Sequence, residues 1–392
     1  MTETRKIVIL GASCAGLGVA HYLAKHVLPQ LNEETKYELH IVDPSTRFWW
    51  HIAAPRQIVT MKDLTVDKTF VPIKDGFKQY TSLQDNIFFH QGTASALDIE
   101  ARTVTLTNSG SEDKQTLDYY ALVIATGTTS PTPLTTFHGD YTVSQKALEE
   151  VNTKLASAKE IVISGGGPIG VETAGEIGQV FGNKAKITLI TGSDKLLPVL
   201  NEARSKKAEG MLAKLGVSVI YKVTVDKDEA SSSDPEKTAL TLSNGKTISA
   251  DVYIPAHGVK PNSEFLPAAL KDDKGYTKTN SSTLRIDAAG PRVYAAGDIA
   301  GVDNGGMLNM YETLPVLNRN IAKDLLEKHA VPDQTYTFKP SETQVVPIGP
   351  KTGVGAYSGW TIPGFAVAMV KGKDYFVGQV PDFTEGKKFV KA

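Results

Sequence analysis

Short apolar runs rich in β-branched residues recur along the chain and end at small-residue turns. Residues 6–10 (KIVIL) lead into Gly11 and then into apolar residues at helical spacing, and residues 37–42 (YELHIV) form the next apolar run. Residues 160–164 (EIVIS) and 186–190 (KITLI) repeat this arrangement around a second glycine-rich turn. Because strand, glycine turn, helix and strand are typical of a βαβ unit, the pattern predicts two such units.

A second pair of apolar runs also ends in glycine, at residues 118–127 and 251–258. A later run, residues 292–301 (RVYAAGDIAG), has no glycine-rich loop of its own, so we expect it to complete the first unit. From about residue 335 short apolar stretches alternate with turns, which predicts a small α+β C-terminal domain. Residues 226–237 are polar and are expected to form an exposed hairpin loop.

Composition and charge narrow the class of protein. The 392 residues are 41% hydrophobic and 22% charged, as in globular proteins, and the length suggests two or three domains. The net charge of −1 gives no general reason to bind nucleic acid. The single cysteine, Cys14, excludes an intramolecular disulfide and a two-cysteine redox pair, and the histidines show no metal-binding spacing, so no metal is expected. The first residues lead directly into an apolar run, which favours a cytoplasmic protein.

The first glycine loop, residues 11–16 (GASCAG), lacks the middle glycine of the dinucleotide-binding pattern GxGxxG. Ser13 occupies that position, although Asp43 at the end of the next strand could accept ribose hydroxyl groups. A dinucleotide site and a plain strand-to-helix turn are therefore both open for this loop. Cys14 is either a reactive thiol at a helix start or a small packing residue, and the sequence favours packing.

The second loop, residues 165–170 (GGGPIG), has all three glycines between a strand and a helix, and it predicts a dinucleotide site. Its following strand ends at Thr191, where neither a carboxylate for NADH nor an arginine for NADPH is present. Glu172 is either a solvated acid near the helix start or a contact to the nicotinamide half of the cofactor, and its position alone favours the solvated acid.

These loops, together with three further motifs, resemble the flavoprotein superfamily with two dinucleotide-binding domains, the pyridine nucleotide-disulfide oxidoreductases. Within it, the chain is similar to the apoptosis-inducing-factor-like and ferroptosis-suppressor-like NAD(P)H:quinone oxidoreductases, particularly fungal ones. The motifs are GASCAG with Asp43, ATG at 125–127, GGGPIGVETAGEI from Gly165, AAGD at 295–298 and KGKDYF at 371–376. The resemblance implies an α/β fold with two Rossmann-like domains, the second inserted in the first. The implied domains are an FAD domain at 1–130 and 264–334, an NAD(P)H domain at 131–263 and a C-terminal domain at 335–392.

The resemblance also implies the cofactors and their residues. FAD is expected on the first domain and NADH or NADPH on the second. The FAD residues implied are Gly11, Ala12, Ser13, Ala15, Gly16, Asp43, Arg56, Ala125, Thr126, Gly127, Gly297 and Asp298. The NAD(P)H residues implied are Gly165, Gly167, Pro168, Ile169, Gly170 and Glu172, the last beside the nicotinamide. Disulfide reductases of this fold carry a cysteine pair where this chain has FWWHIAAPRQIV at 48–59, without cysteine.

The implied reaction is hydride transfer from NAD(P)H to FAD, followed by electron transfer to a quinone or another small acceptor. Glu172, Lys371 and Lys373 are the candidate catalytic residues, although the lysines could equally be solvated residues around a turn. A flavoenzyme of specialised metabolism and an apoptosis-factor-like signalling protein remain alternatives. Residues 364–370 (GFAVAMV) could contact a membrane surface peripherally, but a buried strand is the more usual assignment. A homodimer is also compatible with this resemblance. The tryptophans Trp49 and Trp50 are assigned to packing, with His51 near the flavin.

Overall fold

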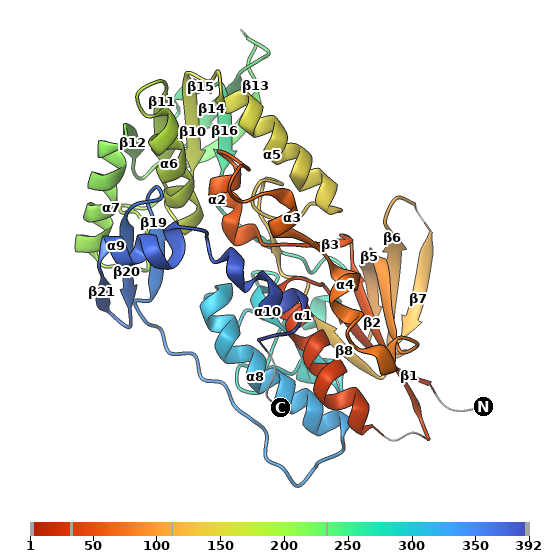
Figure 1. The fold of residues 1–392 in the computed structure, drawn as a ribbon. Helices are drawn as coiled ribbons and strands as arrows, with labels where there is room; N and C mark the ends of the chain where they lie inside the picture. The colour runs from red at the N-terminus through yellow and green to blue at the C-terminus, as the bar shows by residue number, and fades with distance from the viewer. Residues whose placement is uncertain (1–3, 32–33, 112, 233, 389–392) are drawn as a thin grey trace.

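The computed structural model describes residues 4–31, 34–111, 113–232 and 234–388, and it contains two sheets of parallel strands one above the other (Figure 1). The larger sheet has seven strands, parallel from β18 to β5 and antiparallel from β5 to β7. Their order is β18 (Val293–Ala295), β8 (Ala121–Ile124), β1 (Thr4–Leu10), β2 (Lys36–Asp43), β5 (Ile87–Asp98), β6 (Thr103–Asn108) and β7 (Lys114–Asp118). The run at 292–301 therefore completes the first unit, as predicted.

The second sheet is entirely parallel and has four strands. Their order is β12 (Val217–Ile220), β11 (Lys186–Ile190), β10 (Glu160–Ser164) and β16 (Val252–Pro255). Helices α5 (Tyr141–Leu155), α6 (Pro168–Phe181) and α7 (Glu202–Lys214) belong to this part. The expected hairpin projects from it as the antiparallel sheet β13 (Val225–Ala230), β14 (Thr238–Leu242) and β15 (Thr247–Ala250). Both predicted βαβ units are confirmed.

The chain enters and leaves the second part through two adjacent segments. Strand β9 (Thr128–Thr129) pairs antiparallel with β17 (Lys260–Pro261). Next to them, the Thr126 hydroxyl donates to the Asn262 carbonyl at 2.7 Å, and the Asn262 side-chain amide donates to the Thr126 carbonyl at 2.8 Å. The second domain is therefore an insertion in the first, as the sequence predicts.

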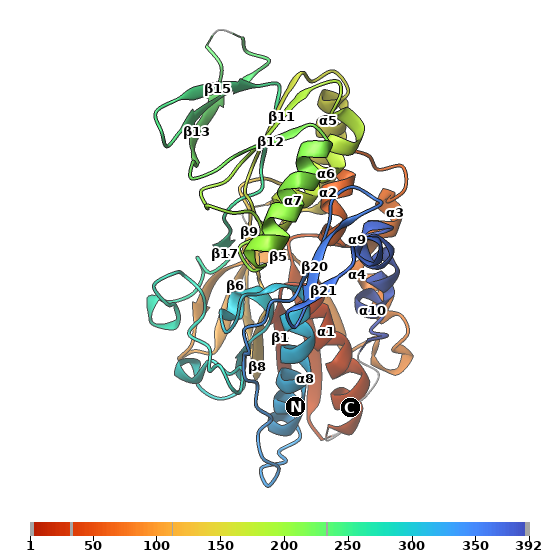
Figure 2. The same ribbon diagram turned by 90° about the vertical axis from the view of Figure 1, so that its left-hand side faces the viewer.

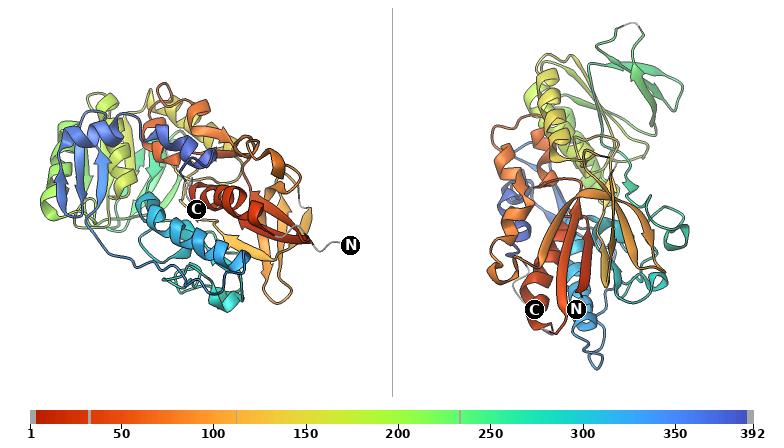
Figure 3. Two further views of the ribbon diagram at one scale, coloured as in Figure 1. Left: turned by 60° about the horizontal axis from the view of Figure 1, so that its bottom comes forward. Right: turned by 90° about the vertical axis from the view of Figure 1, so that its right-hand side faces the viewer.

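Two helices cover one face of the larger sheet (Figure 3), and their buried residues pack against it. Helix α1 (Cys14–Tyr22) is buried along its whole length, and α8 (Gly306–Leu325) buries Met310, Leu314, Leu317 and Ile321 at helical spacing. The connection between β2 and β5 contains β3 (Arg47–Trp49), α2 (Ala54–Gln57), α3 (Val66–Thr69), β4 (Phe70–Pro72) and α4 (Ile73–Phe77). Within the described ranges, no helix is long and apolar enough to cross a membrane.

The C-terminal part lies across both dinucleotide domains (Figure 2). Strands β19 (Gln344–Pro347), β20 (Gly353–Tyr357) and β21 (Trp360–Ile362) form a small antiparallel sheet beside α6 and α7, and α10 (Val380–Thr384) packs on α1. A Cβ atom on Gly175 of α6 would lie 2.9 Å from the Gly349 nitrogen, so glycine is required where β19 approaches. The prediction of a buried strand at 364–370 is wrong: α9 (Gly364–Val367) begins directly after Pro363, the helical turns continue to residue 372, and Val367 is the buried residue of this segment.

Candidate functional site

The first glycine loop connects β1 to α1 in a space that excludes side chains. Gly11 has φ +102°, and a Cβ atom there would lie 2.3 Å from the Ala125 carbonyl oxygen. A Cβ atom on Gly16 would lie 1.8 Å from the Gly11 carbonyl oxygen. Ser13, at the position of the missing middle glycine, is exposed at the start of α1. The two glycines therefore let the loop backbone pack closely against the ATG motif, which follows β8. The N-terminus of α1 above the loop stays accessible.

Asp43 lies directly beside this loop at the end of β2. One of its carboxylate oxygens accepts a hydrogen bond from the Ala12 amide at 2.6 Å, and the other accepts from the Ser45 amide at 2.8 Å. Burial raises the pKa of Asp43 to about 6, and the two amide donors act in the opposite direction. The carboxylate is thus fixed next to the loop in the position that binds ribose hydroxyl groups in dinucleotide-binding folds.

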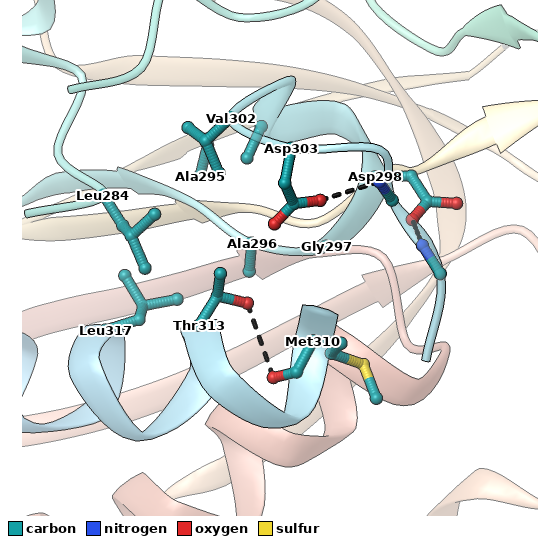
Figure 4. Close-up of a pocket in the computed structure, with 13 residues that line it drawn as sticks. Leu284, Ala295, Ala296, Gly297, Asp298, Val302, Asp303, Met310, Thr313 and Leu317 are labelled. Carbon is teal, nitrogen blue, oxygen red and sulfur yellow. Dashed lines mark hydrogen bonds between the residues drawn. The ribbon is translucent and has the colours of Figure 1, made fainter. Parts of the chain in front are cut away.

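The GD motif after β18 lies on the other side of the same loop. Gly297 has φ +71°, and a Cβ atom there would lie 2.8 Å from the Ala15 Cβ. Asp298 accepts a hydrogen bond from the Gly306 amide at 2.8 Å, at the start of α8. These residues line a small cavity between β18 and α8, shown in Figure 4. The glycine loop, Asp43 and this cavity fit the pyrophosphate, ribose and ribityl parts of FAD.

The second glycine loop repeats the first with more open space. Gly165 has φ +125° and would place a Cβ atom 2.2 Å from the Ala256 carbonyl oxygen, and a Cβ atom on Gly170 would lie 1.9 Å from the Gly165 carbonyl oxygen. At the middle glycine, Gly167, a Cβ atom would meet no heavy atom within 4 Å. Pro168 begins α6, and Ile169 is 39% exposed beside it. The open backbone at a helix N-terminus fits a second dinucleotide pyrophosphate.

Glu172 and Lys371, predicted separately as catalytic candidates, form a buried ion pair. Lys371 Nζ donates to Glu172 Oε1 at 2.5 Å and also contacts the Val345 carbonyl at 3.4 Å. The interpretation of Glu172 as a solvated acid is wrong, because its side chain is buried. The face of α6 that carries it is covered by β19 and by residues 368–373, called the C-terminal turn below. Burial raises the pKa of Glu172 to about 7, against the lowering effect of Lys371. The solvated alternative fits Lys373, which is exposed, but not Lys371.

A second ion pair lies one helical turn further along α6. Arg56 donates to both carboxylate oxygens of Glu176, at 2.7 and 3.0 Å, and its guanidinium also donates to the carbonyls of Gly372 and Lys373. The Tyr375 hydroxyl donates to Glu176 at 3.0 Å. Protein groups therefore accept from Arg56 on several sides, which favours a role in holding the C-terminal turn over a direct contact to cofactor. The sequence reasoning missed Glu176 and Tyr375, although the four-residue spacing of the two glutamates indicates a shared helix face.

The other residues singled out in the sequence have packing roles. Trp49 stacks on Phe70 with ring centroids 5.2 Å apart, and the Trp50 indole donates to the Tyr375 carbonyl at 2.8 Å. Both tryptophans are buried, which confirms the packing assignment. Cys14 is buried as well, and burial raises the pKa of its thiol to about 12, so the packing assignment is confirmed here too. His51, by contrast, is exposed.

Two glycine loops at parallel strand ends, one domain inserted in the other, define a protein that binds two dinucleotides. The family model described as pyridine nucleotide-disulphide oxidoreductase matches residues 5–318, and the chain belongs to this family. It is 37% identical to the oxidoreductase phnG of Penicillium herquei, over 100% of this chain and 98% of that protein. It is 31% identical to the oxidoreductase ptaL of Pestalotiopsis fici, over 97% and 99%, and 26% identical to ferroptosis suppressor protein 1 of Xenopus tropicalis, over 96% and 95%.

Solved structures share the fold at lower identity. Reduced CoADR-RHD of Bacillus anthracis has a TM-score of 0.67 at 19% identity, covering 88% of this chain and 60% of that one. The sulfide:quinone oxidoreductase of Aquifex aeolicus has a TM-score of 0.64 at 17% identity, covering 82% and 77%. These structures confirm the Rossmann fold. The family match and the sequence relatives confirm the apoptosis-inducing-factor-like resemblance. FAD and NADH or NADPH are the cofactors of the chain, as its family and its two loops agree.

Proposed function

We propose that the chain is an NAD(P)H oxidoreductase that passes electrons through FAD to a quinone-like acceptor, without a redox disulfide. Bound FAD would supply the two-electron chemistry that links a nicotinamide donor to a separate acceptor. The observation that carries this proposal is the buried Glu172–Lys371 ion pair, which joins the helix of the NAD(P)H loop to the C-terminal turn. FAD is assigned to Gly11–Gly16, Asp43 and Asp298, and NAD(P)H to Gly165–Gly170.

We assign to this ion pair the supply of a proton to the reduced quinone. A quinone that becomes a quinol takes up two electrons and two protons, while a hydride carries two electrons and only one proton. The second proton must come from a group beside the acceptor. Lys371 is only 14% exposed and donates a hydrogen bond to Glu172, whose pKa burial raises to about 7. Lys371 can therefore donate at the acceptor and be reprotonated through Glu172 near neutral pH.

The cysteine content supports direct transfer to the acceptor. Cys14 is the single cysteine of the 392 residues, so no second thiol of this chain can pair with it. Its thiol is buried at the start of α1, and burial raises its pKa to about 12, which keeps it protonated and unreactive at neutral pH. Reduction of a disulfide substrate through a cysteine pair of this chain is therefore excluded from the proposal.

An anaerobic titration tests the proposal. NADH and NADPH are added separately to purified FAD-loaded protein while the flavin absorbance is followed, and a quinone is then added. We expect bleaching by a nicotinamide and recovery with the quinone. Absence of flavin, or no bleaching by either nucleotide, would overturn the proposal. Slow recovery with quinones and rapid recovery with another small molecule would instead support the flavoenzyme of specialised metabolism.

Variants test the ion pair. Lys371→Met and Glu172→Gln should each slow reoxidation by quinone about 100-fold, within the usual range for a lost general acid. The rate for the unmodified protein should also fall as pH rises through about 7, and Glu172→Gln should remove this dependence. Lys373→Met tests the second lysine, and Lys339→Met, which changes an exposed lysine outside the C-terminal turn, is the control. Unchanged reoxidation in Lys371→Met would remove that lysine from the mechanism.

We also propose that the exposed face of α9 and the following turns contacts a lipid surface peripherally. Phe365 is 67% exposed and Met369 72%, and Trp360 on β21 is 81% exposed. Lys351 and Lys373 are exposed beside the close contact between Gly372 and Pro350, so cations flank the apolar face as anionic lipid headgroups require. Flotation with anionic liposomes should occur, and should be lost in Phe365→Ser with Met369→Ser. A dimer that forms through this face without flotation would overturn the lipid assignment.

A further inference from the structure

The two dinucleotide domains can be aligned residue by residue at the strand end that approaches the cofactor ribose. In both domains the amide of the first loop glycine donates, at 2.7 Å, to a carbonyl at the end of the neighbouring strand, that of Val42 in the first domain and that of Ile190 in the second. The following residues are Asp43 in the first domain and Thr191 in the second. Thr191 therefore occupies in the second domain the position that Asp43 occupies in the first.

The turns that follow these two residues are also alike. The Asp43 carboxylate accepts from the amide of Ser45, two residues on, at 2.8 Å, and the Thr191 hydroxyl accepts from the amide of Ser193, two residues on, at 3.2 Å. The difference is charge: a carboxylate at this position accepts the 2′-hydroxyl of a ribose and repels a 2′-phosphate, whereas a hydroxyl does not. The second domain thus lacks the group that would disfavour NADPH.

The chain segment that contains Lys222 lies next to the neutral residue Thr191. The Lys222 amide donates to the Ser193 carbonyl at 3.1 Å, and the next amide, of Val223, donates to the Thr191 carbonyl at 3.1 Å. Lys222 has φ +57°, a left-handed conformation unusual for a residue with a side chain, and it is exposed. Across the described part of the chain, its ammonium takes part in no ion pair. The connection after β12 therefore crosses the strand end and leaves a free positive charge there.

Two further charged residues, Asp194 and Lys195, follow Ser193 directly. Lys195 donates to the Leu200 carbonyl at 2.6 Å and is held away in that contact. Asp194 is exposed and is the acid that follows Ser193 directly. Asp194 lies just after Thr191, the residue that matches Asp43. Its carboxylate is the competing acceptor for a ribose hydroxyl and is therefore included in the test below.

We propose that the second domain selects NADPH over NADH, with the 2′-phosphate held by Lys222 and by the hydroxyl of Ser193. This inference rests on the proposed binding of NAD(P)H to the second glycine loop. It deepens that proposal by assigning the nucleotide and the two residues that distinguish a 2′-phosphate from a 2′-hydroxyl.

Calorimetric titration of the full-length, FAD-loaded protein with NADP⁺ and NAD⁺ tests the inference without turnover. NADP⁺ should bind about 10- to 100-fold more tightly, the range expected for charge-assisted hydrogen bonds to one phosphate. Lys222→Asn, in which asparagine tolerates the left-handed backbone, should remove most of this preference and leave NAD⁺ binding unchanged. Thr191→Asp, which copies the first domain, should reverse the preference. Lys246→Asn, at another exposed lysine of the same domain, is the matched control.

The outcomes separate this inference from the proposed function. Equal affinity for the two nucleotides, unaltered by Lys222→Asn, would overturn the inference while the proposed function stands. Tighter binding of NAD⁺ that is lost in Asp194→Asn would also overturn it and assign the ribose contact to Asp194. Binding of neither nucleotide to FAD-loaded protein, together with no bleaching of the flavin, would overturn the proposed function itself.

Discussion

The two glycine loops have the same backbone and different side chains. Each begins with a glycine of positive φ against the carbonyl of a later strand, and each has a second glycine that touches the first. Counted from the first glycine, Ser13 matches Gly167, and Gly18 in α1 matches Glu172 in α6. The shared backbone geometry provides a dinucleotide site in each domain. The side chains differ, and only α6, not α1, carries acids that can take part in proton transfer.

The C-terminal part contacts the two helices by different chemistry. It meets α6 through Lys371, which pairs with Glu172, and through the Tyr375 hydroxyl, which donates to Glu176. It meets α1 through the Thr384 carbonyl, which accepts a hydrogen bond from His21. The His21 ring stacks on Phe77 with centroids 4.2 Å apart. The contact with α6 thus includes a buried ion pair, whereas the contact with α1 is a neutral hydrogen bond, and the two attachments should respond differently to mutation and to pH.

The sharpest test of the two-loop comparison breaks one loop at a time. Gly16→Ala should abolish FAD binding, because its Cβ atom would lie 1.8 Å from a backbone oxygen. Gly170→Ala, with the matching clash at 1.9 Å, should leave FAD bound and weaken NADP⁺ binding by more than about 100-fold, as expected when a phosphate loop is displaced. Flavin content and calorimetry measure the two effects.

The control for both variants is Gly210→Ala in α7, where a Cβ atom would meet nothing within 4 Å. It should keep both cofactors and stabilise the protein by about 0.5–1 kcal/mol, since alanine is the better helix former. Loss of both cofactors in Gly170→Ala would contradict the separate assignment of the two loops.

The ion pair of Arg56 and Glu176 should give the next largest effect. Removal of one partner in Glu176→Gln leaves a buried guanidinium without its carboxylate and should cost about 3–5 kcal/mol of unfolding free energy. Chemical denaturation measures it, and proteolysis should show that the C-terminal turn is released first. Glu202→Gln, which breaks the exposed pair with Lys206, should cost less than about 1 kcal/mol. Equal costs in the two variants would contradict a structural role for Arg56.

The glycine loops could be predicted because their signal is local. Strand, glycines and helix follow one another within about 20 residues, and Asp43 comes at the end of the next strand. The pairing of Glu172 with Lys371 could not be predicted, because 199 residues separate them and the approach depends on how β19 packs against α6. For the same reason position alone favoured a solvated Glu172: a residue near a helix start is usually exposed, and here a distant segment covers it.

The segment at 364–370 shows a different limit. Seven apolar or small residues are too few to distinguish a strand from a helix by spacing alone. The structure shows a helix that leaves Phe365 and Met369 exposed, which a buried strand would not. Arg56 was implicated by its position near the flavin segment, but its partners come from α6 and from the C-terminal turn, which no local pattern connects to it.

Variants of Asp43 and of the matching Thr191 test the comparison of the two domains at the position of the cofactor ribose. Asp43→Asn keeps the size of the side chain but leaves only one oxygen for the two amides of Ala12 and Ser45. FAD affinity should fall about 10- to 100-fold, the range for a lost hydrogen bond to a charged group. Fluorescence of released flavin measures the change. Thr191→Val at the matching position should leave flavin affinity unchanged, and a loss of FAD there would contradict the residue-by-residue alignment of the domains.

The attachment of the C-terminal part to α1 should weaken in acid. Burial lowers the pKa of His21 to about 4, so the ring is neutral at pH 7, with Nε2 donating to the Thr384 carbonyl at 3.1 Å and Nδ1 accepting from the Tyr80 hydroxyl at 2.9 Å. Because the pKa is lower in the folded chain than the ordinary 6.5, this contribution is present above pH 6.5 and is lost as pH falls towards 4.

The expected loss is about 2 kcal/mol by pH 5, from the proton uptake that only the unfolded chain allows. Hydrogen exchange of α10 between pH 7 and 5 measures it, once the intrinsic pH dependence of exchange is removed. Asp43 and Glu172 have raised pKa values, so the stability that their protonation contributes is lost as pH rises. This effect is opposite in direction to that of His21. The difference between the natural chain and His21→Phe therefore isolates the histidine, and His329→Phe at an exposed position is the control. Equal acid sensitivity in His21→Phe would place the weakening elsewhere.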